Sequence, residues 1–314
     1  PMKLLIPADA PFRLDPAPAG VDVAYYSPGA PVPDELLDAD AAVVWGFAAK
    51  NLTQFANDMP NLRWVQAMTA GPDALLAAGL PDHVQITVGR GFHDQTVTEH
   101  AVALTLALTT RLPHYLARQA EHVWDDPGFR PLHVADRLAS IIDTDVLIWG
   151  FGSIGTHMAP VFSALGARVR GVASTAGVRA GYECFTDAEL PRLLPETDVL
   201  VMVLPNTPLT RNALNAERLA LLKPTSLVVN VGRGTCVDEA ALADALNGGR
   251  LGGAGLDVFA REPLVPDSPL WDAPNTLITP HVAGGRPLGV EAAVRANVAH
   301  VLAGEPLERL AKRT

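Results

Sequence analysis

Short apolar runs recur along the first 90 residues, and turn-forming residues separate each run from the next. Helical stretches at 33–40 and 74–79 lie between some of these runs. Strands that alternate with helices indicate a parallel sheet covered on both faces. The strands predicted in this region are 3–7, 21–26, 41–46, 62–68 and 84–88.

A long helical pattern follows at 95–119, and Pro113 is expected to kink or interrupt it. Six continuous runs rich in valine and leucine come next, as expected of parallel strands buried on both faces. These runs are 145–150, 167–173, 198–204, 226–232, 252–259 and 275–280. A last helix at 290–304 ends at a glycine. The pattern therefore predicts a second, doubly wound α/β sheet.

Composition and charge narrow the class of protein. A chain of 314 residues suggests two domains at about 150 residues per domain. Hydrophobic residues make up 48% and charged residues 18%, which favours a globular protein. With 34 acidic and 24 basic residues the net charge is −10, and no basic run is present. Nucleic acid and anionic membranes are therefore not expected as partners.

The two cysteines, Cys184 and Cys236, indicate no disulfide framework and no zinc cluster, and Cys236 is interpreted as a packing residue. The histidines lack the spacing of metal ligands, so no metal site is expected. The apolar stretch 101–108 is shorter than the roughly 20 residues that span a bilayer, and the first residues do not resemble a signal peptide. We therefore expect a cytoplasmic protein.

A glycine fingerprint follows the apolar strand at 145–149 and opens an apolar helix. Its glycines allow a tight turn and a close approach to a pyrophosphate, whose charge is met by amides at the helix N-terminus. In this context of strand, turn and helix the motif predicts a dinucleotide site. The residues expected to bind are Gly150, Gly152, Ser153, Ile154 and Gly155.

The second strand of the predicted dinucleotide fold would end in a carboxylate if NAD were preferred, because that group binds the ribose hydroxyls. Here the strand continues into Ser174 and Thr175 with no acidic residue, and Arg179 follows. These side chains could accept a 2′-phosphate, so NADP is at least as plausible as NAD. The alternative is that Arg179 is a solvated loop residue.

Three chemically complementary residues follow predicted strands in the second series. Arg233 lies between two glycines and could bind a carboxylate through its guanidinium fork. Glu262 and His281 follow the next two strands. Ligands of open α/β sheets bind outside the carboxyl ends of the strands. We therefore predict a catalytic set at this edge.

These motifs together resemble those of the D-isomer-specific 2-hydroxyacid dehydrogenase family, which includes glyoxylate/hydroxypyruvate reductases and D-3-phosphoglycerate dehydrogenase. The resemblance rests on GFGSIG at 150–155, on the stretch 204–264 from LPNTPLT to VFAREPL, and on TPHVAGG at 279–285. It implies an α/β fold of two Rossmann-like lobes with doubly wound parallel sheets. An NAD(P)-binding domain at 99–283 would be inserted into a flavodoxin-like substrate domain formed by 1–98 and 284–314, and the protein would be a homodimer.

The resemblance also implies roles for individual residues. Arg233 would bind the substrate carboxylate, His281 would act as general acid and base, and Glu262 would favour the protonated imidazole. Asp257 would contact the nicotinamide amide. Further cofactor contacts are implied at Thr98, Leu204, Pro205, Thr210 and Val231, and substrate contacts at Thr69, Ala70 and Gly71.

The reaction implied is hydride transfer between the nicotinamide and C2 of a small 2-hydroxy or 2-keto acid. Two alternatives stay open: a dehydrogenase acting on formate or phosphite, and a cofactor-sensing protein similar to the corepressors of this family. Trp45, Gly46, Phe47 and Arg286 could shape substrate choice, or they could form an apolar strand end and a solvated arginine.

Overall fold

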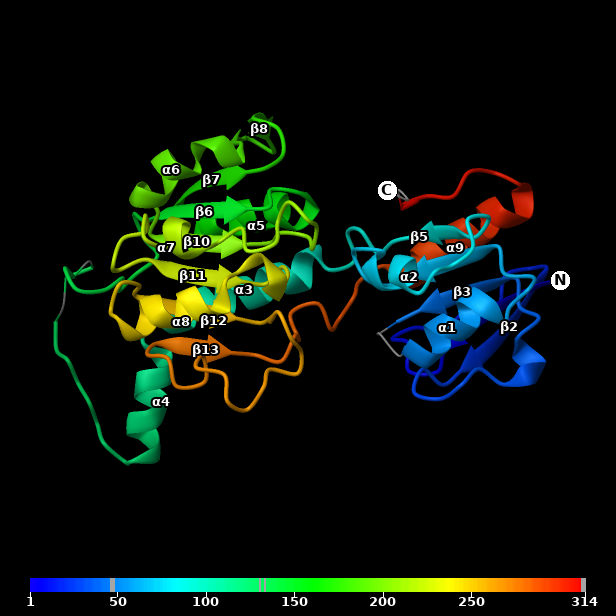
Figure 1. Ribbon diagram of the computed structural model, residues 1–314, viewed down its shortest axis with the longest axis horizontal. Coiled ribbons are helices and arrows are strands. Elements are labelled where there is room, and N and C mark those ends of the chain that lie inside the picture. Colours follow the sequence, from blue (N-terminus) through cyan, green and yellow to red (C-terminus); the bar gives the residue numbers. More distant parts are fainter. Residues whose placement is uncertain (46–48, 130, 133, 312–314) are drawn as a thin grey trace. The chain divides into compact units, whose positions relative to one another are not determined.

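The computed structural model describes residues 1–45, 49–129, 131–132 and 134–311. Gly46 and Phe47, which the sequence linked to substrate choice, lie outside the described residues. The chain divides into two compact units (Figure 1). One contains residues 1–93 and 286–314 and is called the terminal unit here; the other contains residues 94–285 and is called the central unit.

The terminal unit contains a five-stranded sheet in the order β2-β1-β3-β4-β5, with every neighbouring pair parallel. This is the order of flavodoxin-like sheets. Its strands are β1 (Met2–Pro7), β2 (Val21–Tyr26), β3 (Ala41–Val44), β4 (Trp64–Ala67) and β5 (Gln85–Thr87). The five strands predicted from the apolar runs are confirmed, with ends that differ by at most two residues.

Helices cover both faces of the terminal sheet because its strands bury side chains on both sides. Leu52 and Phe55 of α1 (Ala49–Asn57) and Leu75 of α2 (Asp73–Ala77) pack against one face. The other face is covered by α9 (Val290–Ala303), which comes from the far end of the chain and ends at Gly304 as predicted. The prediction of a helix at 33–40 is wrong, because only the short 3-10 helix η1 (Asp34–Leu36) forms there.

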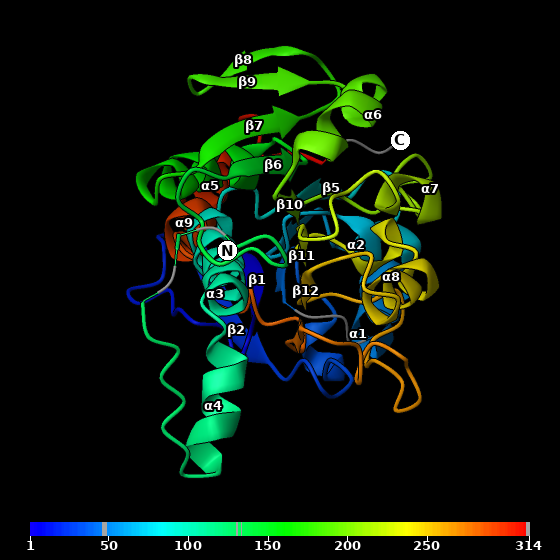
Figure 2. The same ribbon diagram turned by 90° about the vertical axis from the view of Figure 1, so that its left-hand side faces the viewer.

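The central unit contains an eight-stranded sheet in the order β13-β12-β11-β10-β6-β7-β9-β8, which Figure 2 shows from β8 to β12. All pairs are parallel except β8 with β9. The strand order reverses between β6 and β10, where such folds bind ligands. The strands are β6 (Asp145–Trp149), β7 (Arg168–Val172), β8 (Gly177–Arg179), β9 (Tyr182–Phe185), β10 (Val199–Met202), β11 (Leu227–Asn230), β12 (Gly253–Leu256) and β13 (Thr276–Ile278).

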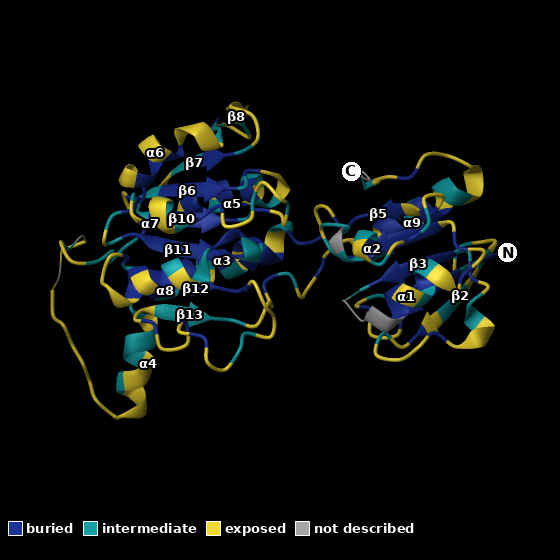
Figure 3. Ribbon diagram, viewed as in Figure 1, coloured by how far each residue is buried: buried dark blue, intermediate teal, exposed yellow. Residues whose placement is uncertain are grey.

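The central strands are buried along most of their length (Figure 3), and their alternate residues belong to two separate cores, one on each face. For example, Ile148 packs with α3 (Asp94–Thr109) and α5 (Ser153–Ala164), whereas Leu147 packs with helices of the opposite layer. That layer contains α6 (Leu190–Leu193), α7 (Ala216–Leu219) and α8 (Glu239–Asn247). Short 3-10 helices complete the unit: η2 (Asp187–Glu189), η3 (Leu194–Glu196) and η4 (Gly234–Cys236).

The long helical pattern at 95–119 forms two helices, α3 and α4 (Leu112–Ala120). Between them Arg111 adopts a left-handed conformation with φ 58°, and Pro113 lies in the first turn of α4. The predicted interruption is therefore confirmed. The hairpin of β8 and β9 was not predicted, because these strands are short and contain no apolar run.

The structure confirms the predicted α/β fold with two doubly wound, mainly parallel sheets. Among the described residues, no helix is both long enough and apolar enough to span a membrane.

Candidate active site

Three neighbouring strands of the central sheet end in loops that hold the predicted catalytic residues. Arg233 follows β11, Glu262 follows β12 and His281 follows β13. Because these strands are parallel and adjacent, their carboxyl ends share one edge of the sheet. The sequence placed all three residues beyond strand ends, and the structure places them there.

His281 and Glu262 form the closest pair in this set. Nδ1 of His281 lies 2.7 Å from Oε2 of Glu262, and Oε1 of Glu262 accepts a hydrogen bond of 3.0 Å from the amide of Phe259. Because a carboxylate accepts hydrogen bonds, we assign the proton of this pair to Nδ1. The other ring nitrogen, Nε2, is then available for proton exchange. Both side chains stay accessible, with 39% and 36% of their surface exposed.

The turn that carries Arg233 is held by close backbone contacts on either side. A Cβ on Gly232 would lie 2.6 Å from the amide nitrogen of Leu204, and one on Gly234 would lie 1.9 Å from the carbonyl carbon of Phe259. Buried Asn230 accepts a hydrogen bond from the amide of Gly232 and donates one to the carbonyl of Arg233. The Arg233 backbone is therefore fixed next to the segment that positions Glu262.

Asp257 organises the backbone around His281. Its carboxylate is fully buried and accepts hydrogen bonds from the hydroxyl of Thr279 (2.6 Å) and from the amides of Val282 (2.9 Å) and Ala283 (3.0 Å). The amide of His281 donates to the Asp257 carbonyl, and His281 has a left-handed φ of 53°. The resemblance linked Asp257 to the nicotinamide amide alone, so sequence reasoning missed this positioning role.

His100 of α3 joins the same network. Its Nε2 lies 2.9 Å from the hydroxyl oxygen of Thr279 and 3.4 Å from Oδ1 of Asp257. This contact could not be predicted from the sequence, because His100 precedes Thr279 by 179 residues. The network therefore ties α3 to the loops after β12 and β13.

The three glycines of the fingerprint serve different purposes. Gly150 has φ 106°, and a Cβ there would lie 2.5 Å from the carbonyl oxygen of Val203. A Cβ on Gly155 would lie 2.7 Å from the carbonyl oxygen of Gly150, so this glycine permits close packing of α5. A Cβ on Gly152 would meet nothing within 4 Å. This open backbone at the start of α5 fits the close approach of a pyrophosphate.

Arg179 is held beside the glycine fingerprint. Its Nη1 donates to the carbonyl of Phe151 at 2.9 Å, and its Nη2 donates to the hydroxyl of Thr175 at 2.6 Å. Ser174 and Thr175 are exposed at the end of β7. The structure therefore brings two of the three proposed 2′-phosphate contacts together and leaves Ser174 open to solvent.

The remaining predicted cofactor residues lie in different settings. Thr98 is buried on α3, and its hydroxyl has no hydrogen-bond partner within the part of the chain that the structure describes. The Thr210 hydroxyl is used inside its own loop, donating to the carbonyl of Pro205 at 2.6 Å. Leu204 lies against Gly232, and Val231 is buried. An unpartnered hydroxyl at Thr98 and the open Gly152 both fit a polar ligand.

The predicted substrate residues of the terminal unit form a turn after β4. Thr69 donates through its hydroxyl to the carbonyl of Gly71 at 2.7 Å, while Ala70 is exposed. Trp45 directly follows β3, and its ring stacks on that of His93 with centroids 6.1 Å apart. Both segments lie at the carboxyl edge of the terminal sheet.

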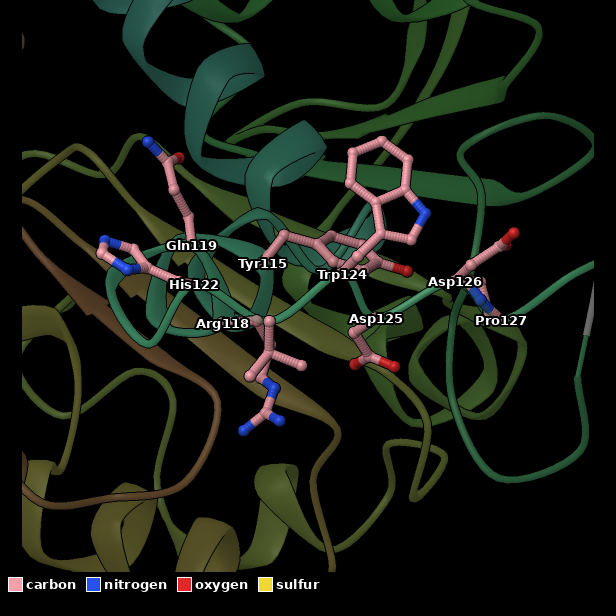
Figure 4. Close-up of a pocket in the computed structure, with 9 residues that line it drawn as sticks. Tyr115, Arg118, Gln119, His122, Trp124, Asp125, Asp126 and Pro127 are labelled. Atoms are coloured by element: carbon pink, nitrogen blue, oxygen red, sulfur yellow. The ribbon is translucent and has the colours of Figure 1, made fainter.

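Two other features are not part of the predicted catalytic set. Burial raises the pKa of the Cys236 thiol, which fits its interpretation as a packing residue. The hollow in Figure 4, of about 670 Å³, is formed by α4 and the segment after it and contains none of the predicted site residues. Among the described residues, no group of three or more potential metal ligands is found.

The glycine fingerprint has an open backbone at Gly152 and follows β6, next to the point where the strand order of the central sheet reverses. These two features define a dinucleotide-binding α/β protein. The sequence model described as "D-isomer specific 2-hydroxyacid dehydrogenase, NAD binding domain" matches residues 102–283. The chain therefore belongs to the D-isomer-specific 2-hydroxyacid dehydrogenase family, and as a member it is an NAD(P)-dependent oxidoreductase.

Individual relatives agree with this membership. Glyoxylate/hydroxypyruvate reductase A of Enterobacter sp. is 32% identical over 287 residues, covering 88% of this chain and 86% of that protein. The D-3-phosphoglycerate dehydrogenase of Mycobacterium bovis is 37% identical over 191 residues, covering 60% of this chain but 34% of that protein, so the match spans about a third of it. The crystal structure of an NADPH-dependent glyoxylate/hydroxypyruvate reductase from Sinorhizobium meliloti, in complex with NADP and sulfate, has a TM-score of 0.81 at 29% identity and covers 99% of this chain and 98% of that one.

We predict that Asp257→Asn destabilises the protein by about 1–3 kcal/mol, because one buried acceptor oxygen becomes a donor that faces other donors. The measurement is the thermal unfolding midpoint, with the exposed Asp272→Asn as a matched control of equal charge change. Equal midpoints for the two variants would show that Asp257 does not hold the loop.

Proposed function

We propose that the protein is a D-2-hydroxyacid dehydrogenase that works as a 2-ketoacid reductase. The His281–Glu262 pair, next to a cation on the neighbouring strand end, carries this proposal. It combines a proton donor with a site for a carboxylate, which are the groups that reduction of a 2-ketoacid requires. The names of the Enterobacter and Sinorhizobium relatives point to the same class of substrate.

The proposed mechanism assigns one task to each residue. The bound nicotinamide supplies the hydride. His281 donates the proton on Nε2 to the keto oxygen during reduction and takes it back during oxidation. Glu262 holds the ring through Nδ1 and stabilises the protonated imidazole. Arg233 binds the substrate carboxylate and so orients the keto carbon.

The two units would divide the binding tasks. The central unit would bind the cofactor through the open backbone at Gly152 and the buried hydroxyl of Thr98. Asp257 would hold the backbone of the His281 loop through its hydrogen bonds, in addition to the nicotinamide contact that the resemblance implies. In the terminal unit, the turn at 69–71 is held by a hydrogen bond from the Thr69 hydroxyl to the Gly71 carbonyl, and its backbone amides would offer the substrate contacts that the resemblance implies.

A steady-state assay tests this function directly. We expect oxidation of NADPH or NADH in the presence of glyoxylate, hydroxypyruvate, pyruvate or phenylpyruvate. His281→Ala should lower kcat by about 10²-fold or more, because the general acid is lost, and should leave cofactor affinity unchanged. His157→Ala, an exposed histidine on α5, serves as the control.

Three results would contradict the proposal. An unchanged kcat in the His281→Ala variant would remove this residue from the mechanism. Turnover with formate or phosphite but with no 2-ketoacid would favour the first alternative. Tight cofactor binding without any turnover would favour a cofactor-sensing protein.

We also propose that NADP is accepted at least as well as NAD. The contacts of Arg179 with Thr175 and Phe151 hold a cation beside the expected position of the adenosine ribose. No carboxylate follows β7 directly to repel a 2′-phosphate. The Sinorhizobium structure contains NADP.

Arg179→Ala should therefore lower kcat/KM for NADPH by about tenfold or more, because a charge-assisted hydrogen bond is lost, and should change kcat/KM for NADH much less. The ratio of the two constants is the useful measurement, since a general disturbance of the loop affects both cofactors alike. A strong preference of the unmodified protein for NADH would refute this proposal.

The homodimer implied by the resemblance has a candidate surface in the central unit. No residue of α4 is buried, and Leu112 and Leu116 on this helix are exposed. Trp124 is 92% exposed, and Phe129 is fully exposed. Apolar side chains gathered on residues 112–129 are typical of a protein interface. We propose that a second copy of the chain covers them.

Leu116→Glu combined with Trp124→Glu should convert a dimer into a monomer, because charges would have to be buried at the interface. Sedimentation velocity at several protein concentrations measures the change. Leu302→Glu, at an exposed leucine on α9, is the control and should leave the mass unchanged. A monomer already in the unmodified protein would refute the dimer.

A further inference from the structure

An acidic side chain contacts the glycine fingerprint from a different helix. Asp94 is the first residue of α3, and its Oδ2 accepts a hydrogen bond from the hydroxyl of Ser153, the first residue of α5. Ser153 belongs to the fingerprint and was predicted to bind the cofactor, whereas Asp94 was not singled out. The two residues are 59 positions apart, so the sequence alone does not show the contact.

The other carboxylate oxygen of Asp94 is also informative. Oδ1 is buried and has no hydrogen-bond partner among the described residues. The hydroxyl of Thr98, four residues later on the same helix, is in the same state. Residues at i and i+4 share one face of a helix. This face of α3 therefore presents two unpartnered oxygen atoms and packs along α5.

The contact places a negative charge where the cofactor requires positive potential. The first amides of α5 and the open backbone of Gly152 favour an anion at this point. A serine hydroxyl has one proton to donate. While Asp94 accepts that proton, Ser153 cannot donate it to a pyrophosphate oxygen.

We propose that Asp94 lowers the affinity of the glycine fingerprint for dinucleotides by competing with the pyrophosphate for the Ser153 hydroxyl and by repelling its charge. This inference rests on the placement of the cofactor in the proposed function. In the free protein the carboxylate holds the Ser153 hydroxyl at the first residue of α5. When a dinucleotide is bound, Ser153 rotates toward the phosphate and Asp94 remains as a nearby negative charge that favours release.

Direct binding tests the inference without any turnover. The dissociation constants of NADPH and NADH are measured by fluorescence titration for the unmodified protein, Asp94→Asn and Asp94→Ala. We expect both variants to bind both cofactors about tenfold more tightly, since a negative charge beside the glycine fingerprint is removed. The gain should be similar for the two cofactors, because they share the pyrophosphate.

Three further measurements separate this effect from a general change in charge. Glu217→Gln alters an exposed carboxylate in the first turn of α7, in the opposite helix layer, and should leave both dissociation constants unchanged. In a Ser153→Ala background the gain from Asp94→Asn should shrink several-fold, because the contested hydroxyl is absent. Raising the salt concentration should also reduce the gain by screening the repulsion.

The outcomes are distinguishable from those of the proposed function. Unchanged or weaker binding in both folded Asp94 variants would overturn the inference alone, as would a gain that persists in full without Ser153. If neither the unmodified protein nor any variant bound a nicotinamide cofactor, the proposed function itself would fail, and this inference with it. A thermal unfolding midpoint near that of the unmodified protein establishes that each variant is folded.

Discussion

The candidate site depends on backbone packed directly against backbone at the carboxyl ends of the central strands. Gly150 meets Val203, Gly232 meets Leu204, and Gly234 meets Phe259 at distances that leave no room for a side chain. Each contact joins loops from different strands, so the spacing between loops is fixed by main-chain atoms. Main chain is less free to move than side chains, and catalytic geometry tolerates little displacement. These glycine contacts therefore fix the backbone positions from which the side chains of Arg233 and Glu262 extend.

The buried carboxylate of Asp257 holds the His281 loop, which the glycine contacts do not reach. Asp257 is buried, and its carboxylate oxygens accept hydrogen bonds from the Thr279 hydroxyl and from two backbone amides of the His281 loop. An unpaired buried charge is costly, so the loop that satisfies it is held strongly in place. His100 extends the network to α3, the same helix that carries Thr98. His281 is therefore supported by residues from three separate elements.

Sequence reasoning predicted the parts of the molecule that have strong local signals. Buried parallel strands give continuous apolar runs, and the residues beyond their ends were found without any structure. The β8–β9 hairpin was missed because its strands are short and contain no apolar run. The hydrogen bonds of Asp257 with Thr279 and of Asp94 with Ser153 join positions that are distant in the sequence. The identity of a residue alone does not show which distant residue it contacts. Long-range polar contacts therefore required the structure.

The net charge of −10 does not exclude anionic ligands from the candidate site. Anionic ligands can still bind, because helix amides and single cations act over short distances while a diffuse surface charge is screened. Arg233 and Arg179 supply such cations at separate strand ends. Asp94 acts in the opposite sense at the start of α5. A cofactor that must leave after each turnover gains from binding that is only moderately tight, since release often limits the rate. A carboxylate beside the glycine fingerprint would achieve that balance without altering Arg233, Glu262 or His281.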